Sequence, residues 1–132
     1  MRPSPPINAD SKTFWEAANR RELLYQTCPK CGYVQFYPRA RCTKCHHDAL
    51  EWRTSSGQGT VHTFTLNHRA PTPAFQAMVP YVIALIDMKE GFRIMANVLD
   101  APPDQVRIGM PVKIVFEATE NGQLIPQASA KI

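Results

Sequence analysis

The chain has 132 residues, a formal net charge of +4 and an apolar fraction of 44%, values of a globular protein with one ordinary domain or two very small ones. No apolar run approaches the roughly 18 residues of a membrane-spanning helix, and the proline-rich N-terminus lacks the apolar core of a signal peptide. We therefore expect a cytoplasmic protein. In the cytoplasm, cysteines bind metal more often than they form disulfides.

The first 23 residues are predicted to form an extended arm followed by a short helix. Asp10 or Ser11 is a suitable N-cap, and the helical spacing of apolar residues continues to about Arg20. Phe14 and Trp15 lie on the apolar face of this helix. Two interpretations stay open: these rings pack on the protein's own core, or they anchor a partner protein, for which paired aromatic side chains are well suited.

The cysteines of the chain form two Cys-x-x-Cys pairs separated by ten residues, and they are Cys28, Cys31, Cys42 and Cys45. Each pair can turn tightly enough to aim two sulfurs at one ion, so that two pairs complete a tetrahedron. We expect Zn²⁺, which accepts tetrahedral sulfur without redox demands, although iron fits the same ligands. Four protein ligands leave no position for a substrate, so the predicted role of the metal is structural.

Other interpretations of this motif are weaker. Two disulfides in a secreted domain, or a redox pair formed by Cys28 and Cys31 alone, fit the repeated spacing less well. His46 or His47 could replace one thiolate, although the four cysteines already suffice as ligands. Gly32 follows the first pair, where a positive φ would let backbone N–H groups approach the sulfurs, and His46 stands at the matching position after the second pair.

Residues 24–54 are assigned to a zinc ribbon. Strands are predicted at 23–26, 34–37 and 50–53, and residues 54–59 form a linker of small residues with two glycines. The ribbon leaves about 75 residues for a second unit, which is near the lower limit for an independent core. We therefore expect the two parts to pack together or the protein to dimerise.

Residues 55–132 are predicted to form a five-stranded barrel. Apolar and β-branched runs bounded by turn residues indicate strands at 60–66, 81–86, 92–99, 112–116 and 124–130. A short helical turn lies at 102–109, Asn121-Gly122 is a hairpin turn, and Pro126 marks an edge strand or a bulge. This is the element order of an OB-fold. The predicted fold is thus mainly β, with an N-terminal helix, a zinc ribbon and a five-stranded OB-fold barrel.

Several short motifs occur in a characteristic order, namely Phe14-Trp15 before Leu23-Leu24, Cys28-x-x-Cys31-Gly32, Tyr37-Pro38-Arg39 before Cys42-x-x-Cys45, Gly59-Thr60-Val61, Pro80-Tyr81 and Ile108-Gly109-Met110-Pro111-Val112. Over nearly the whole chain they resemble the acyl-CoA-associated OB-fold proteins with an N-terminal rubredoxin-like zinc ribbon, long classified as a domain of unknown function. The chain departs from that family at His46 and at Thr43, where proline is common, and neither change touches a predicted metal ligand.

The resemblance implies a non-catalytic accessory subunit. Its expected partners are thiolase-like enzymes, acyltransferases, lipid-transfer-protein-like aldolases and enoyl-CoA hydratases, with which it would form complexes that bind or channel acyl-CoA. The family has no agreed catalytic residues, so only the four cysteine ligands carry over.

A nucleic-acid-binding protein is the alternative function. OB-folds and zinc ribbons both bind nucleic acids, and Phe64, His68 and Arg69 offer stacking and phosphate contacts. However, Zn²⁺ and four thiolates together carry −2 and lower the formal charge from +4 to +2, which weakens this hypothesis.

An autonomous hydrolase or hydratase would need an acid–base pair, such as His62 or His68 with Asp87. Strand alternation puts His62 on the same side as Phe64 and Leu66. We therefore expect a histidine at the edge of the core and not a catalytic base.

The first barrel loop, residues 69–79, is the predicted contact surface for the partner or acyl-CoA. It is stiffened by prolines and unusually apolar, and with its flanks it contributes the candidate residues His68, Arg69, Phe75, Met78 and Tyr81. Alternatively, Phe75 and Met78 fold back over an open end of the barrel. Phe14 and Trp15 form a second candidate surface.

Overall fold

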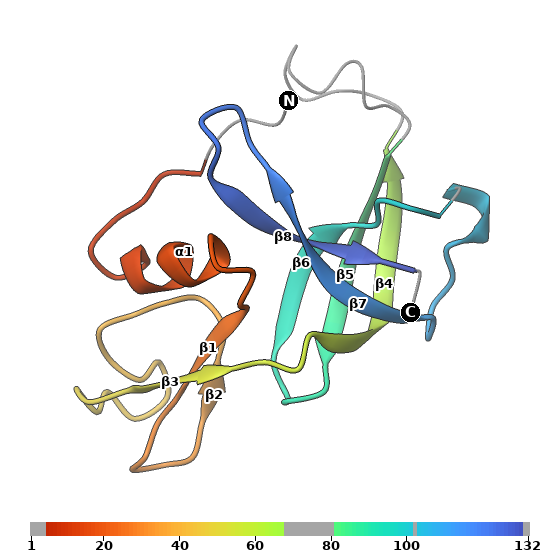
Figure 1. Cartoon of the computed structure of the whole chain (residues 1–132). Coiled ribbons are helices and arrows are strands. Elements are labelled where there is room, and N and C mark those ends of the chain that lie inside the picture. The colour runs from red at the N-terminus through yellow and green to blue at the C-terminus, as the bar shows by residue number, and fades with distance from the viewer. Residues whose placement is uncertain (1–4, 68–80, 102, 131–132) are drawn as a thin grey trace.

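The computed structural model describes residues 5–67, 81–101 and 103–130. It consists of one short α-helix, a small three-stranded sheet and a larger five-stranded sheet that curls into a barrel (Figure 1). Among the described residues, no helix is both long enough and apolar enough to cross a membrane.

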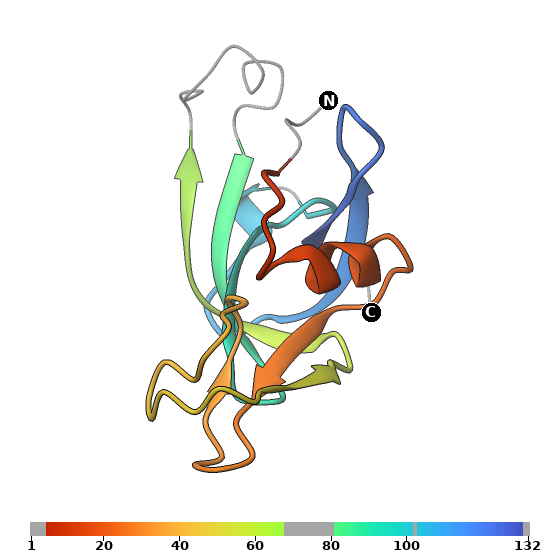
Figure 2. The same ribbon diagram turned by 90° about the vertical axis from the view of Figure 1, so that its left-hand side faces the viewer.

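The helix α1 spans Lys12–Ala18 and begins after Ser11. Ser11 and Asn8 exchange hydrogen bonds: the Ser11 N–H donates to Asn8 Oδ1 (3.0 Å) and the Asn8 N–H donates to Ser11 Oγ (3.1 Å). The helix ends two residues before the predicted Arg20. Figure 2 shows that α1 lies across one side of the barrel, where its buried face includes Phe14.

The small sheet has the strand order β2-β1-β3, with β1 at Leu24–Thr27, β2 at Val34–Gln35 and β3 at Glu51–Thr54. Both neighbours run antiparallel to β1. All three predicted strands are present, although the middle one in sequence stops two residues earlier than predicted. The ring of Phe36, the next residue, stacks on Phe92 of the barrel, 5.4 Å between centroids.

The larger sheet has the order β6-β5-β4-β7-β8 and is antiparallel throughout. Its elements are β4 (Gln58–Asn67), β5 (Tyr81–Met88), β6 (Arg93–Asn97), the 3₁₀ helix η2 (Pro103–Gln105), β7 (Pro111–Ala118) and β8 (Leu124–Ser129). A parallel bridge between Val98 and Ala128 nearly closes the barrel. The predicted OB-fold order is therefore confirmed, and the Pro126 strand lies at an end of the strand order.

The ribbon and the barrel share one hydrophobic core. Phe92, in the turn between β5 and β6, stacks on Tyr25 of the ribbon at 4.9 Å, and Phe36 in turn contacts Phe14 of α1 at 5.4 Å. Buried apolar residues continue from these rings into the barrel interior, where Val61, Val82, Ile86 and Ile94 are almost fully enclosed. The expectation that the two small parts pack together is confirmed.

A carboxylate fastens the linker between the two sheets. Ser55 Oγ donates to Glu90 Oε1 (2.6 Å), and the Ser56 N–H donates to Glu90 Oε2 (2.9 Å). Burial alone would raise the pKa of Glu90, but these hydrogen bonds hold the pKa below its usual 4.5. The β5–β6 turn is thus tied to the chain that leaves the ribbon.

Candidate functional site

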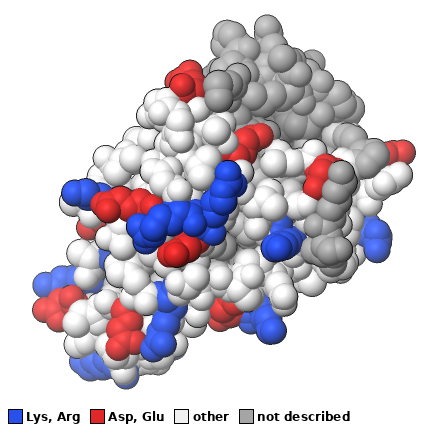
Figure 3. Space-filling model, viewed as in Figure 1, with Lys and Arg blue, Asp and Glu red and all other residues white. Residues whose placement is uncertain are grey.

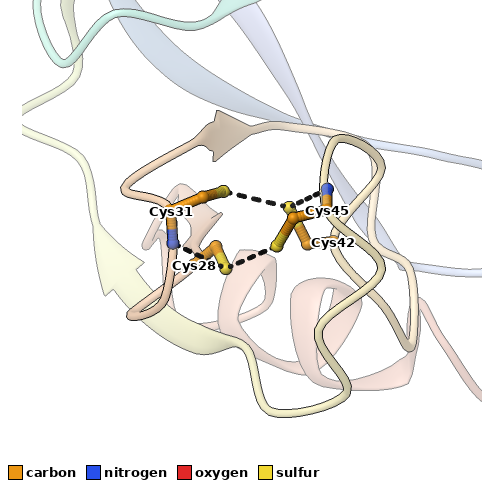
Figure 4. A group of neighbouring side chains, drawn as sticks. All are labelled: Cys28, Cys31, Cys42 and Cys45. Atoms are coloured by element: carbon orange, nitrogen blue, oxygen red, sulfur yellow. Dashed lines mark hydrogen bonds between the residues drawn. The ribbon is translucent and has the colours of Figure 1, made fainter.

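Two tight turns of the ribbon bring the four cysteines together (Figure 4). In the first turn the Cys31 N–H donates to Cys28 Sγ at 3.5 Å. In the second, the N–H groups of Lys44 and Cys45 donate to Cys42 Sγ at 3.4 and 3.5 Å. Backbone N–H groups aimed at sulfur stabilise the thiolate form that a metal requires.

The spacing of the sulfurs fits a four-coordinate metal. The Sγ atoms of Cys28 and Cys45, and those of Cys31 and Cys42, are each 3.6 Å apart, and all four lie within 4.8 Å of one another. A zinc ion with Zn–S bonds of about 2.3 Å needs S–S separations of about 3.8 Å. A disulfide needs about 2.0 Å, and in the structure all four cysteines are free. The cluster is therefore a four-cysteine metal site.

A residue with positive φ follows each cysteine pair. Gly32 has φ +77°, as the sequence predicted, and His46 has φ +66° at the equivalent place after the second pair. His46 is exposed, and its carbonyl accepts a bond from Arg41 Nη1 (3.2 Å). The metal-ligating group found among the described residues contains only the cysteines, so neither His46 nor His47 takes the place of a thiolate.

The four thiols influence one another's ionisation. Burial alone would raise the pKa of Cys42, but hydrogen bonds from the N–H groups of Cys45 and Lys44, with neighbouring thiols, lower it to about 6. For Cys31 a backbone N–H from Tyr33 lowers the pKa, whereas burial and the other three thiols raise it to about 12. Because four negative charges cannot gather in so small a space unaided, full ionisation requires a cation between the sulfurs.

Two buried glutamines, which no sequence motif predicts, connect the cysteine turns. Gln35 Nε2 donates to Gln26 Oε1 (2.9 Å), which also accepts the N–H of Arg39 (3.0 Å). Gln35 Oε1 accepts both the N–H (3.0 Å) and the Oγ1 hydroxyl (3.2 Å) of Thr43, one residue after Cys42. Their only sequence signal is a glutamine at an inward position of each strand.

A cleft of about 530 Å³ lies between α1, the ribbon and the barrel. Its wall includes Trp15 and Tyr37 on the ribbon side and Met95 and Pro126 on the barrel side. Phe14 also lines it but is only 4% exposed and belongs to the core. Of the two predicted aromatic contact residues, Phe14 therefore packs on the protein's own core, while Trp15 is half-buried at the cleft.

The remaining predicted contact residues are mostly not covered by the structure. His68, Arg69, Phe75 and Met78 lie outside the described residues, and Tyr81 is the first residue of β5. Their proposed contact with acyl-CoA or a partner stays a prediction.

The predicted place of His62 at the edge of the core, on the same side as Phe64 and Leu66, is wrong. A bulge between Val61 and Thr63 turns Val61 into the core and leaves the His62 side chain 46% exposed, where Nδ1 lies 3.2 Å from Asp87 Oδ2. Arg93 Nε donates to the other oxygen of Asp87 at 2.6 Å, and mainly this bond holds the pKa of Asp87 below its usual value. His62 and Asp87 thus meet, but as part of an exposed charge cluster.

Charges of both signs are interspersed on the face seen in Figure 3. Phe64, the proposed stacking residue for nucleic acid, is half-buried and packs against the core. An OB-fold that binds single strands combines a basic groove with accessible aromatic rings. Neither observation favours that function.

Comparison with known proteins covers both parts of the chain. Residues 15–51 match the family model "ChsH2, rubredoxin-like zinc ribbon domain", and residues 52–117 match "ChsH2, C-terminal OB-fold domain". A DUF35 domain-containing scaffold protein of Methanothermobacter thermautotrophicus is 32% identical over 85% of either chain. A solved chain described as "Ltp2-ChsH2(DUF35) aldolase" superposes with a TM-score of 0.86, 31% identity, and coverage of 98% of this chain and 100% of that one.

Longer relatives match over part of their length. A probable enoyl-CoA hydratase alpha subunit of Thermomonospora curvata is 38% identical over 85% of this chain but only 34% of its own length. The 3-oxo-4,17-pregnadiene-20-carboxyl-CoA hydratase alpha subunit of Mycobacterium tuberculosis is 33% identical over 88% of this chain and 36% of its own. The chain thus spans about a third of these hydratase subunits.

Proposed function

This chain belongs to the ChsH2/DUF35 family of zinc-ribbon and OB-fold proteins, and on that premise we propose that it is a non-catalytic accessory subunit of an enzyme that acts on acyl-CoA. Its partner is a thiolase-like, lipid-transfer-protein-like aldolase, acyltransferase or hydratase subunit. The chain helps that partner to bind or channel the acyl-CoA.

The observation that carries this proposal is the similarity to the chain of the Ltp2-ChsH2(DUF35) aldolase, which extends over 98% of the residues. Similarity to the relatives named scaffold proteins and hydratase alpha subunits points the same way. Fold alone would be weak support because OB-folds serve many functions, but here ribbon, helix and barrel match together.

The four cysteines hold a structural Zn²⁺ in this proposal, with iron as a substitute in recombinant protein. When bound, the ion supplies cross-linking and no open coordination position, so it takes no part in substrate chemistry. Cys28, Cys31, Cys42 and Cys45 are its ligands.

The test starts from the tagged full chain expressed in its native host. We expect an acyl-CoA enzyme to co-purify, and we expect the two purified proteins to form a complex of fixed stoichiometry when mixed. Light scattering after size-exclusion chromatography measures that complex. A chain that recovers no acyl-CoA enzyme from its host would contradict the proposed function.

Single-stranded DNA provides a second measurement. The accessory function predicts no binding at about 50 mM salt, a concentration at which phosphate contacts are strong. Tight binding that weakens steeply with added salt would instead favour the nucleic-acid function.

A further inference from the structure

The strand β6 has an outer edge without a partner strand among the described residues. Hydrogen bonds at both ends of its pairing with β5 fix the alternation: Met88 N–H donates to Phe92 C=O (2.8 Å) and Val98 N–H to Val82 C=O (3.2 Å). In the intervening antiparallel register, residues 94 and 96 therefore bond to β5, whereas the backbone groups of 93, 95 and 97 point away from it.

Of the outward-facing backbone groups of β6, one N–H is already satisfied. The Asn97 N–H donates to the Gln127 side chain at 2.8 Å. For Met95, no hydrogen bond of its outward N–H or C=O occurs within the part of the chain that the structure describes. The Met95 side chain is 62% exposed, so an apolar residue marks this open edge.

The facing strand β8 is protected at its own edge. The Leu124 N–H is bonded by Asn19 Oδ1 (3.0 Å), Pro126 has no N–H, and the Ala128 C=O accepts from the Leu99 N–H (3.0 Å). Capping side chains and proline are the usual means by which proteins prevent unwanted strand pairing. Against that background, the exposed methionine on β6 stands out as an edge left available for pairing.

The cleft described above opens directly onto this edge. Ile94, Met95, Ala96 and Asn97 of β6 line it, and the rings of Trp15, Phe36 and Tyr37 lie on its other side. In Figure 1, β6 lies nearer to α1 and the ribbon than β5 and β4 do, and β8 lies on the same side of the barrel. The space beside the unpaired backbone is therefore walled and largely apolar, with room for one chain segment.

We propose that β6 binds an extended peptide segment of the partner enzyme by strand addition, with the Met95 N–H and C=O as its central hydrogen-bonding groups. Only a peptide backbone presents a donor and an acceptor at strand spacing, which distinguishes this occupant from an acyl chain. Apolar side chains of the segment fill the aromatic side of the cleft.

Charge adds one requirement for the segment. Arg39 lines the cleft, its side chain is exposed, and it has no acidic partner among the described residues. The guanidinium donates only to the neighbouring Pro38 C=O at 2.9 Å. A carboxylate in the segment would pair with it, so the occupant is apolar with an acidic residue. Strand addition at β6 rests on the proposed function in one respect only, namely that the bound segment belongs to an acyl-CoA enzyme.

The first experiment selects peptides from a random 12-residue phage library against the full wild-type protein. The selected peptides are then measured on Met95→Pro and Met95→Thr by fluorescence anisotropy. Proline removes the outward N–H without disturbing the bonds to β5, whereas threonine keeps that N–H. We expect Met95→Pro to weaken binding about tenfold or more and Met95→Thr to weaken it about threefold at most.

A second measurement leaves the protein unchanged and so stays valid if Met95→Pro folds poorly. N-methylation of alternate amides of a selected peptide should abolish binding at the positions that face β6 and spare it at those between them, as strand pairing requires. Binding should also slow hydrogen exchange of the Met95 amide. Arg39→Glu should reduce the affinity of peptides that contain an acidic residue.

Three outcomes would overturn the proposal. The first is a selection that yields no peptide, and the second is a peptide that binds Met95→Pro as tightly as it binds wild type. The third is self-association of the wild-type protein that Met95→Pro abolishes, which would show that a second copy of the chain pairs with this edge. Failure here is distinct from failure of the proposed function. If the wild-type protein and Met95→Pro bind the acyl-CoA enzyme equally well, only the proposed site on β6 is refuted.

Discussion

Two glutamine side chains hold the metal site in place from inside the ribbon. Gln26 and Gln35 are 3% and 7% exposed. Their hydrogen bonds reach Arg39, in the loop between the two cysteine pairs, and Thr43, inside the second pair. Buried polar groups cost free energy unless they are hydrogen-bonded, and each amide nitrogen and oxygen of these two side chains has a partner. Substitution of groups that orient metal ligands typically lowers the metal affinity about 10- to 100-fold.

Gln35→Leu tests this positioning role. The substitution removes the acceptor of the Thr43 N–H and one partner of Gln26, so the second cysteine turn should lose its fixed orientation. We expect zinc affinity to fall about 10- to 100-fold, measured by competition with a chromogenic chelator. Gln58→Leu, at an exposed strand position, is the matched control and should leave the affinity unchanged. Equal zinc affinities of Gln35→Leu and wild type would show that Gln35 does not orient the cysteine ligands.

Cys31→Ser tests the metal site itself. Cys31 is exposed, and serine fills nearly the same volume, so any loss of stability reports on the metal and not on packing. We expect metal content to fall, and the ribbon to lose hydrogen-exchange protection first, because binding energy of the ion is folding energy for so small a unit. A chelator added to wild-type protein should reproduce the effect. Elemental analysis that finds no metal, with two disulfides by mass spectrometry, would refute the site.

At the scale of elements, Glu90 joins the β5–β6 turn to the segment that follows β3. Its two oxygens accept from Ser55 and Ser56, and its pKa lies below 4.5 in the folded protein. A lowered carboxyl pKa stabilises the fold above the unfolded-state pKa, and that stabilisation is lost as the pH falls through the folded-state value.

Glu90→Ala should therefore lower the free energy of unfolding by about 1–2 kcal/mol at pH 7. The difference from wild type should shrink as the pH falls below 4.5 and through the lowered folded-state pKa of Glu90. Urea unfolding at pH 7 and at a pH well below 4.5 measures this. Glu120→Ala removes an exposed glutamate and should have little effect at either pH. If Glu90→Ala remains less stable than wild type by the same free energy in acid, the Glu90 side chain stabilises the fold through packing and not through its charge.

Much of the element order could be predicted from the sequence because apolar, β-branched runs are interrupted by clear turn residues, such as Asn121-Gly122. Bulges leave no such signal, which is why strand alternation places His62 on the wrong side of its strand. Local composition places Gly59 in a linker, yet it lies within β4, where a Cβ would meet Asp87 O at 2.9 Å. Close approach between strands depends on tertiary structure that local sequence does not encode.

The candidate site divides in the same way. The spacing of four cysteines predicts their cluster directly, since the motif is local. The edge of β6 was not predictable, because whether a backbone group is free depends on which strands lie beside it in the barrel. Nor did the sequence distinguish Phe14, enclosed by the shared core, from Trp15 at the cleft; helical spacing places both on one face.

For the whole molecule, the shared core means that ribbon, helix and barrel form one packed unit. Phe92 of the barrel is stacked between Tyr25 and Phe36 of the ribbon, so the cleft between these parts has walls fixed by packing. A preformed surface lowers the entropy cost of binding. This is the property that an accessory subunit needs when it presents a binding surface to an enzyme.

The purified protein alone should turn over no acyl-CoA ester. Its four-thiolate site is closed to substrate, and its His62–Asp87 pair is exposed to water, with Arg93 bound to the carboxylate. A general base works best when its pKa and its reach to a substrate are controlled by a surrounding site, which this exposed pair lacks. Hydration, thiolysis and hydrolysis assays on the isolated chain should therefore give the rate of a buffer blank.

Addition of the co-purified enzyme should restore turnover, and His62→Ala should leave that turnover unchanged. Robust activity of the isolated chain that His62→Ala abolishes would make this protein an enzyme and would overturn the accessory function.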